Sequence, residues 1–131
     1  MPAATVLALC LTLGDRPPVR VPADHFTLSW THSIEKVDWR EEFRVTDKGL
    51  VLERSLVKGS GVGMEPGPDA KLVDGWWVSR PGSRLQDLTL AASRFTGDHT
   101  LCVGDRCAAL HDWLGTTDEG PVRMAACPPP S

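Results

Sequence analysis

The stretch HFTLSWTHSIEKVDWREEFRVT, residues 25–46, decides the fold. Apolar and polar side chains alternate at both of its ends, as they do in β-strands that bury one face. Residues 33–38 connect the two alternating runs. The stretch therefore predicts an antiparallel hairpin with strands at residues 25–32 and 39–46.

Counting by twos gives the inward face of each strand of this hairpin. The inward residues are Phe26, Leu28, Trp30, His32, Trp39, Glu41, Phe43 and Val45. An unpaired buried carboxylate costs several kcal/mol, so Glu41 needs a partner or a wet pocket. Symmetric pairing about the connection places Trp30 opposite Phe43. It also places His32 opposite Glu41, close enough to hydrogen-bond. We predict a structural His32–Glu41 pair, with ligand binding and catalysis by His32 as a base as the alternatives.

Further strand-like runs recur at short intervals, separated by Gly, Pro and Asp turn signals. They span residues 5–13, 19–21, 50–57, 76–79, 85–92, 99–103 and 106–110. No segment has a helical pattern, and 131 residues are enough for one core only. The expected fold class is all-β: a single small antiparallel β-sandwich or partly open barrel with a long Gly/Pro-rich loop.

The N-terminal run TVLALCLTL, residues 5–13, has two interpretations. It is either a buried first strand or a truncated or atypical export signal. No Lys or Arg precedes it and no small-x-small cleavage site follows, so it is not a convincing signal peptide. It is also shorter than the roughly 20 apolar residues of a spanning helix. The sequence therefore does not determine whether the protein is exported from the cytoplasm.

Two segments fall outside the strand pattern. Residues 58–75, KGSGVGMEPGPDAKLVDG, predict a long loop, either an Ω-type loop packed by its own side chains or a lid over Trp76 and Trp77. Its glycines do not follow the phosphate-loop order. Residues 112–131 end in three prolines and predict a mobile Pro-rich tail, so the β domain is expected at residues 1–111.

Charge and motif content exclude several functions. The chain has 14 Lys and Arg against 17 Asp and Glu, a net charge of −3, and its basic residues are scattered, so no nucleic-acid face is expected. His32 and Glu35 lack the spacing of a metal site. Because no nucleophile or cofactor signature occurs either, we expect no enzyme activity, no metal and no cofactor.

The stretch LCVGDRC predicts a second tight hairpin. A two-residue turn at Gly104 and Asp105 places Cys102 opposite Cys107 as a non-hydrogen-bonded pair. That separation is at the short end of the range for a disulfide. The two residues are predicted to form a disulfide in an oxidising compartment, or two packed thiols in a reducing one.

The combination of FTLSWTHSIEKVDWREEFRV, LVKGSGVGMEPGP, DGWW and SRFTGDHTLCVGDRC resembles the bacterial domain of unknown function 1850 family over about residues 7–110. The resemblance implies a small domain, often encoded beside the fused membrane component of TAXI-type tripartite ATP-independent periplasmic (TRAP) transporters. It implies no established activity, and some relatives place the domain outside the cytoplasm on a membrane anchor. The matching residues are His32, Ser33, Glu35, Lys36, Glu41, Glu42, Gly59, Gly61, Gly63 and Met64.

Three functional hypotheses follow. The leading one is a non-enzymatic accessory protein that binds a transporter permease, a solute-binding component or their solute. The alternative is a stand-alone domain for a small organic anion, with Lys36, Lys58, Trp76 and Trp77 around the pocket. The third is an enzyme with His32 as its base. The sequence determines neither the ligand nor the oligomeric state.

Overall fold

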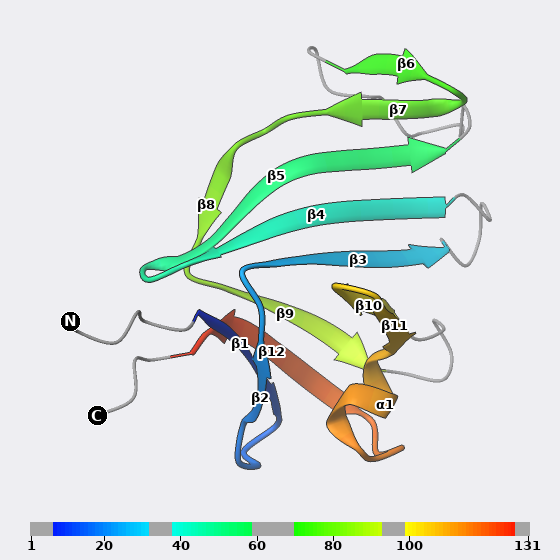
Figure 1. Ribbon diagram of the computed structural model, residues 1–131. Helices are drawn as coiled ribbons and strands as arrows, with labels where there is room; N and C mark the ends of the chain where they lie inside the picture. Colours follow the sequence, from blue (N-terminus) through cyan, green and yellow to red (C-terminus); the bar gives the residue numbers. More distant parts are fainter. Residues whose placement is uncertain (1–6, 32–37, 59–69, 93–98, 128–131) are drawn as a thin grey trace.

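The structure is a computed structural model that describes residues 7–31, 38–58, 70–92 and 99–127 (Figure 1). Its strands are β1 (Ala8–Leu13), β2 (Val19–Pro22), β3 (His25–Thr31), β4 (Asp38–Thr46), β5 (Gly49–Lys58), β6 (Lys71–Val73), β7 (Trp76–Ser79), β8 (Ser83–Leu85), β9 (Asp87–Ala92), β10 (Thr100–Val103), β11 (Arg106–Ala109) and β12 (Gly120–Ala126). One short helix, α1 (Leu110–Leu114), lies between the last two strands. The described chain is thus almost entirely strands and their connections.

The strands form two antiparallel sheets packed face to face. The smaller sheet has the order β2-β1-β12-β9, and the larger has the order β11-β10-β3-β4-β5-β7-β6, with β8 also paired to β5. Figure 1 shows the larger sheet arching over the smaller one, with β6 and β7 at the end farthest from it. Because the sheets do not close on each other, the predicted all-β sandwich is confirmed and no barrel forms.

The core fills the space between the two sheets. Its fully buried side chains alternate along their strands, as in β1, where Leu9, Leu11 and Leu13 point inward. Each fully buried leucine contributes roughly 1.5–3 kcal/mol to stability. Other core residues are Phe26, Leu28, Phe43, Val45, Leu50, Leu101, Leu110, Val122 and Met124. The described part of residues 5–13 is therefore a buried strand.

The hairpin of β3 and β4 forms, but its predicted register is wrong. Trp30 pairs with Trp39, and Leu28 pairs with Glu41. Aromatic packing accounts for this register, because Trp30 stacks on Trp39 with ring centroids 5.8 Å apart. Phe26 and Phe43 stack in the same way at 4.9 Å. Such cross-strand pairs stabilise one register over its neighbours.

The predicted mobile tail is also wrong for most of its length. Its strand β12 lies between β1 and β9, with Val122 and Met124 completely buried. Before it, Trp113 donates a hydrogen bond from Nε1 to the carbonyl of Leu101 at 2.9 Å. The apolar alternation of β12 is short and comes directly after Gly120 and Pro121. For this reason the sequence pattern did not predict a strand there. The single domain therefore extends at least to residue 127.

Two further predictions need correction. Residues 71–73, assigned to the long loop, form β6 and pair with β7. Residues 85–92, predicted as one strand, divide at Gln86 between β8 in the larger sheet and β9 in the smaller one. At this corner β5 begins against β8: a Cβ on Gly49, which has φ +148°, would lie 2.4 Å from the carbonyl oxygen of Leu85. Only glycine fits so close to a neighbouring backbone.

All four cysteines form disulfides. Cys102 and Cys107 are bonded across the β10–β11 hairpin, whose predicted register is confirmed. The other disulfide joins Cys10 of β1 to Cys127, the residue after β12. The two strands it connects already pair with each other. Because its cysteines are 117 residues apart in sequence, it closes nearly the whole chain into one loop.

Candidate binding pocket

One end of the larger sheet gathers aromatic and cationic side chains. The strands β3, β4, β5 and β7 present residues there, at the right-hand end of the sheet in Figure 1. A pocket of 280 Å³ is lined by Ser29, Trp30, Asp38, Trp39, Arg40, Trp76 and Thr100. We call it the tryptophan pocket. Three of the five tryptophans of the chain line it: Trp76 from the face of the sheet that carries Arg40, and Trp30 and Trp39 from the opposite face.

Trp76 is flanked by two positive charges. The Cζ of Arg40 lies 5.3 Å from the Trp76 ring centroid. The Nζ of Lys58 lies 5.6 Å from the same centroid. Strand register accounts for this grouping: Lys58 is paired with Trp76, and Arg40 is paired with Leu56, two residues before Lys58 on the same face of β5. Both cations are thereby held beside the Trp76 ring.

Neither cation is neutralised within the described part of the chain. No carboxylate of residues 7–31, 38–58, 70–92 and 99–127 forms an ion pair with Arg40 or Lys58. The hydroxyls of Ser29 and Thr100 also line the pocket, and Asp38 brings one carboxylate to it. The guanidinium of Arg40 and the two hydroxyls donate hydrogen bonds, and the Lys58 ammonium lies beside the Trp76 ring, so the pocket suits an anionic ligand.

The other side of the same strands carries an aromatic row. His99 packs against Trp30 with ring centroids 5.0 Å apart, and Trp30 stacks on Trp39. The indole Nε1 of Trp39 is buried and has no hydrogen-bond acceptor among the described residues. The row gives the pocket a fixed aromatic backing, because stacked rings restrict one another's rotation.

Glu41 points inward, as its position in the alternation predicts, but its cross-strand neighbour differs from the predicted one. The residue opposite it on β3 is Leu28, which is completely buried. Burial raises the pKa of the Glu41 carboxyl. With this register, the proposed orientation of His32 by Glu41 loses its geometric basis.

Glu42 projects to the other face and forms an ion pair. Its two carboxylate oxygens accept hydrogen bonds from Arg54 Nε at 2.9 Å and from Arg54 Nη2 at 2.5 Å. The hydrogen bonds to Glu42 raise the pKa of Arg54. This bidentate geometry fixes both side chains across β4 and β5. Glu42 is thus occupied within the sheet rather than available to a ligand.

The remaining predicted candidates are placed as follows. Trp76 lies in the pocket, whereas Trp77 projects to the opposite face of β7, as neighbours on a strand must. The candidates outside the described residues are His32, Ser33, Glu35, Lys36, Gly59, Gly61, Gly63 and Met64. Arg40 was not predicted, although its alternation with Trp39 already assigned it to the outer face. No three metal-binding side chains gather in the described ranges.

Comparison with known proteins identifies a family. The family model described as Domain of unknown function (DUF1850) matches residues 26–110, which run from β3 to the first residue of α1. All residues that line the tryptophan pocket lie within this range. No curated protein and no solved structure matches the chain significantly. In the described ranges, no helix has the length and hydropathy needed to cross a membrane.

Proposed function

The chain belongs to the DUF1850 family, and from this membership we propose a non-enzymatic accessory protein that binds a small organic carboxylate in the tryptophan pocket. One observation carries the proposal: Arg40 and Lys58 lie against Trp76 and are not neutralised by any described carboxylate. A carboxylate ligand would complete this arrangement with charge-assisted hydrogen bonds. The tryptophan ring would cover its apolar part.

The transporter context follows from the family resemblance. The resemblance implies that domains of this kind are often encoded beside the fused membrane component of TAXI-type TRAP transporters, and we propose that the ligand is the solute of such a system. The two disulfides support a place outside the cytoplasm, because disulfides persist in oxidising compartments. Thiol counting on protein taken from native cells tests this placement. Four blocked cysteines are expected, and free thiols would contradict it.

Tryptophan fluorescence tests ligand binding directly. We expect the emission of the full chain to change saturably on titration with at least one member of a panel of mono- and dicarboxylates. Trp76→Phe should remove most of the signal, because Trp76 lies against both cations. Arg123→Gln, which alters an exposed ion pair with Asp87 on the smaller sheet, is the matched control and should respond like the wild type. Emission that stays flat across the panel would refute the proposal.

A protein partner is the second candidate, favoured by the exposed edge of β6. Leu72 and Val73 of this strand are 60% and 51% exposed. β6 is the terminal strand of the larger sheet, and a terminal strand can pair with a strand of another protein. Co-purification in mild detergent with the neighbouring permease or solute-binding protein tests this. Loss of co-purification in Leu72→Glu would support an interface at β6, whereas unchanged recovery would exclude it.

A further inference from the structure

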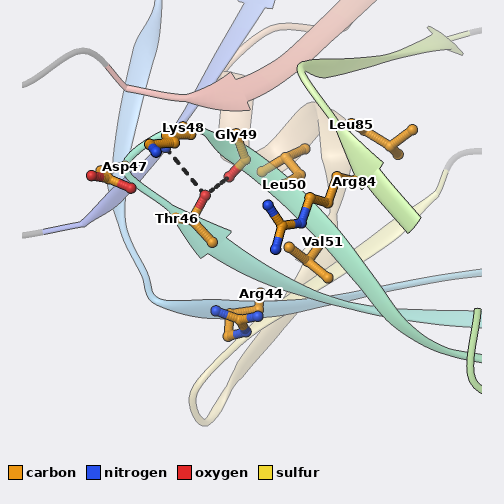
Figure 2. A pocket seen from close by; sticks show the side chains of 9 residues that line it. All are labelled: Arg44, Thr46, Asp47, Lys48, Gly49, Leu50, Val51, Arg84 and Leu85. Atoms are coloured by element: carbon orange, nitrogen blue, oxygen red, sulfur yellow. Dashed lines mark hydrogen bonds between the residues drawn. The ribbon is translucent and has the colours of Figure 1, made fainter. Parts of the chain in front are cut away.

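A second pocket lies at the other end of β4 and β5, around the turn that joins them. Its volume is 360 Å³, and its lining includes Arg44, Lys48 and Arg84. Figure 2 shows the guanidinium of Arg84 lying over β5 in the middle of the lining residues. None of these three residues belongs to the tryptophan pocket. We call it the turn pocket.

Strand register brings the two arginines to one face. Val51 of β5 is paired with Arg44 on β4 and with Arg84 on β8. Neighbouring strands are about 4.8 Å apart, so the backbones of the two arginines are roughly 10 Å apart with Val51 between them. The preceding residue, Leu50, points to the opposite face and is buried in the core. Both arginines are therefore on the outward face, where their long side chains can converge on one anion above Val51.

Hydrogen bonds in the turn between β4 and β5 hold the backbone of the third cationic residue, Lys48. The Thr46 hydroxyl donates to the carbonyl of Gly49 at 3.1 Å and accepts from the Lys48 backbone N–H at 3.2 Å. These bonds hold Lys48 at the rim of the pocket. The lining thus has three cationic side chains against one carboxylate, that of Asp47.

Two of the three cations of the turn pocket have no ion-pair partner in the described ranges. Lys48 and Arg84 form no ion pair with any described residue. Arg44 uses Nε for a 3.4 Å contact with Glu53, both side chains being about half exposed. In the described ranges, its only side-chain hydrogen bond is this one from Nε. An exposed pair of this kind contributes little, so it does not prevent Arg44 from binding a ligand.

We propose that the turn pocket binds a phosphate group. Guanidinium groups match phosphate oxygens bidentately, and a dianion compensates more of the local charge than a carboxylate does. The phosphate would come either from a soluble phosphate monoester or from the headgroup of an acidic lipid. The chemistry recognised is the same, and the two sources are separated by experiment. This site is independent of the tryptophan pocket and of the function proposed for it.

Two experiments test the proposal. The first arm is calorimetric titration of the full chain with phenyl phosphate. The second arm is co-sedimentation with phosphatidic acid vesicles, with phosphatidylcholine vesicles as the control. We expect saturable binding in at least one arm, weakened tenfold or more in Arg84→Gln and in Arg44→Gln. Lys71→Gln removes an exposed cation on β6 and should bind like the wild type. Binding in the first arm assigns a soluble ligand, and binding only to phosphatidic acid vesicles assigns a lipid headgroup.

Two results would overturn the proposal: no binding in either arm, or arginine variants that bind as tightly as Lys71→Gln. Arg40→Gln distinguishes this proposal from the one made for the tryptophan pocket. This substitution should weaken carboxylate binding in the tryptophan pocket and leave phosphate binding in the turn pocket unchanged, because Arg40 lines only the tryptophan pocket.

Discussion

Removing the disulfide between Cys10 and Cys127 should cost more stability than removing the disulfide between Cys102 and Cys107. The two cysteines are 117 residues apart in sequence, whereas Cys102 and Cys107 are separated by 5. A cross-link stabilises mainly by lowering the entropy of the unfolded chain, and the effect grows with the loop it closes. The long loop corresponds to about 5 kcal/mol of unfolding free energy and the short loop to about 2 kcal/mol.

Urea unfolding followed by tryptophan fluorescence measures both values. The variants are Cys10→Ala with Cys127→Ala, and as the matched control Cys102→Ala with Cys107→Ala. Three of the four cysteine side chains are half-buried and that of Cys107 is exposed, so both variants should lose little packing energy. We also expect a larger dependence of free energy on urea for the first variant, because its unfolded chain exposes more surface. A loss for the first variant no greater than for the control would refute the loop-length reasoning.

Three other changes have defined outcomes. Gly49→Ala should lose about 3 kcal/mol of stability, because its Cβ would meet a backbone oxygen of β8. The control Gly14→Ala should lose only about 1 kcal/mol, because Gly14 has φ +57° but open space around it. Equal losses for the two variants in thermal unfolding would contradict this reasoning. Burial raises the pKa of Glu41, so its contribution to stability is complete below the unfolded-state pKa and is lost as pH rises through the folded-state pKa. Glu41→Gln should therefore be more stable than the wild type at neutral pH and lose this pH dependence, and a destabilised variant would show that the carboxylate has a stabilising partner. Trp113→Phe should lose about 1 kcal/mol through its hydrogen bond to Leu101, measured by chemical unfolding, whereas an unchanged midpoint would mean that this bond contributes nothing.

The hairpin of β3 and β4 shows what sequence patterning could and could not determine. Alternation correctly predicted that Phe26, Leu28, Phe43 and Val45 face the core. The predicted register was wrong by an even number of residues, and such a shift leaves every side chain on its face. The two aromatic pairs, Trp30 with Trp39 and Phe26 with Phe43, are symmetric about the same point in the chain. Matching them would have given the observed register.

The missed elements share a different cause. The apolar pattern of β12 is short and begins with a glycine and a proline, so its burial depends on pairing with β1 at the other end of the chain. No local pattern reports such a distant partner. The same holds for the disulfide of Cys127 with Cys10. The Cys102–Cys107 hairpin could be predicted because its turn, its register and its cysteines lie within a few residues.

The candidate pocket was foreseen only in part. Trp76 was predicted from its place beside the Gly-rich segment, and Lys58 from its charge. Arg40 was not, since an outward-facing arginine on a strand is usually only solvated. The pairing of β5 with both β4 and β7 brings these three residues together, and that pairing is a property of the sheet rather than of any one segment.

The most direct test of the account is a calorimetric titration of the Arg40→Gln, Lys58→Gln double variant with the best carboxylate from the fluorescence panel. Both cations lie within 5.6 Å of the Trp76 ring centroid, so their removal should weaken binding at least tenfold and abolish its dependence on salt. Unfolding by urea should be close to that of the wild type, which separates loss of binding from loss of structure. Unchanged carboxylate affinity in the folded double variant would contradict the central claim.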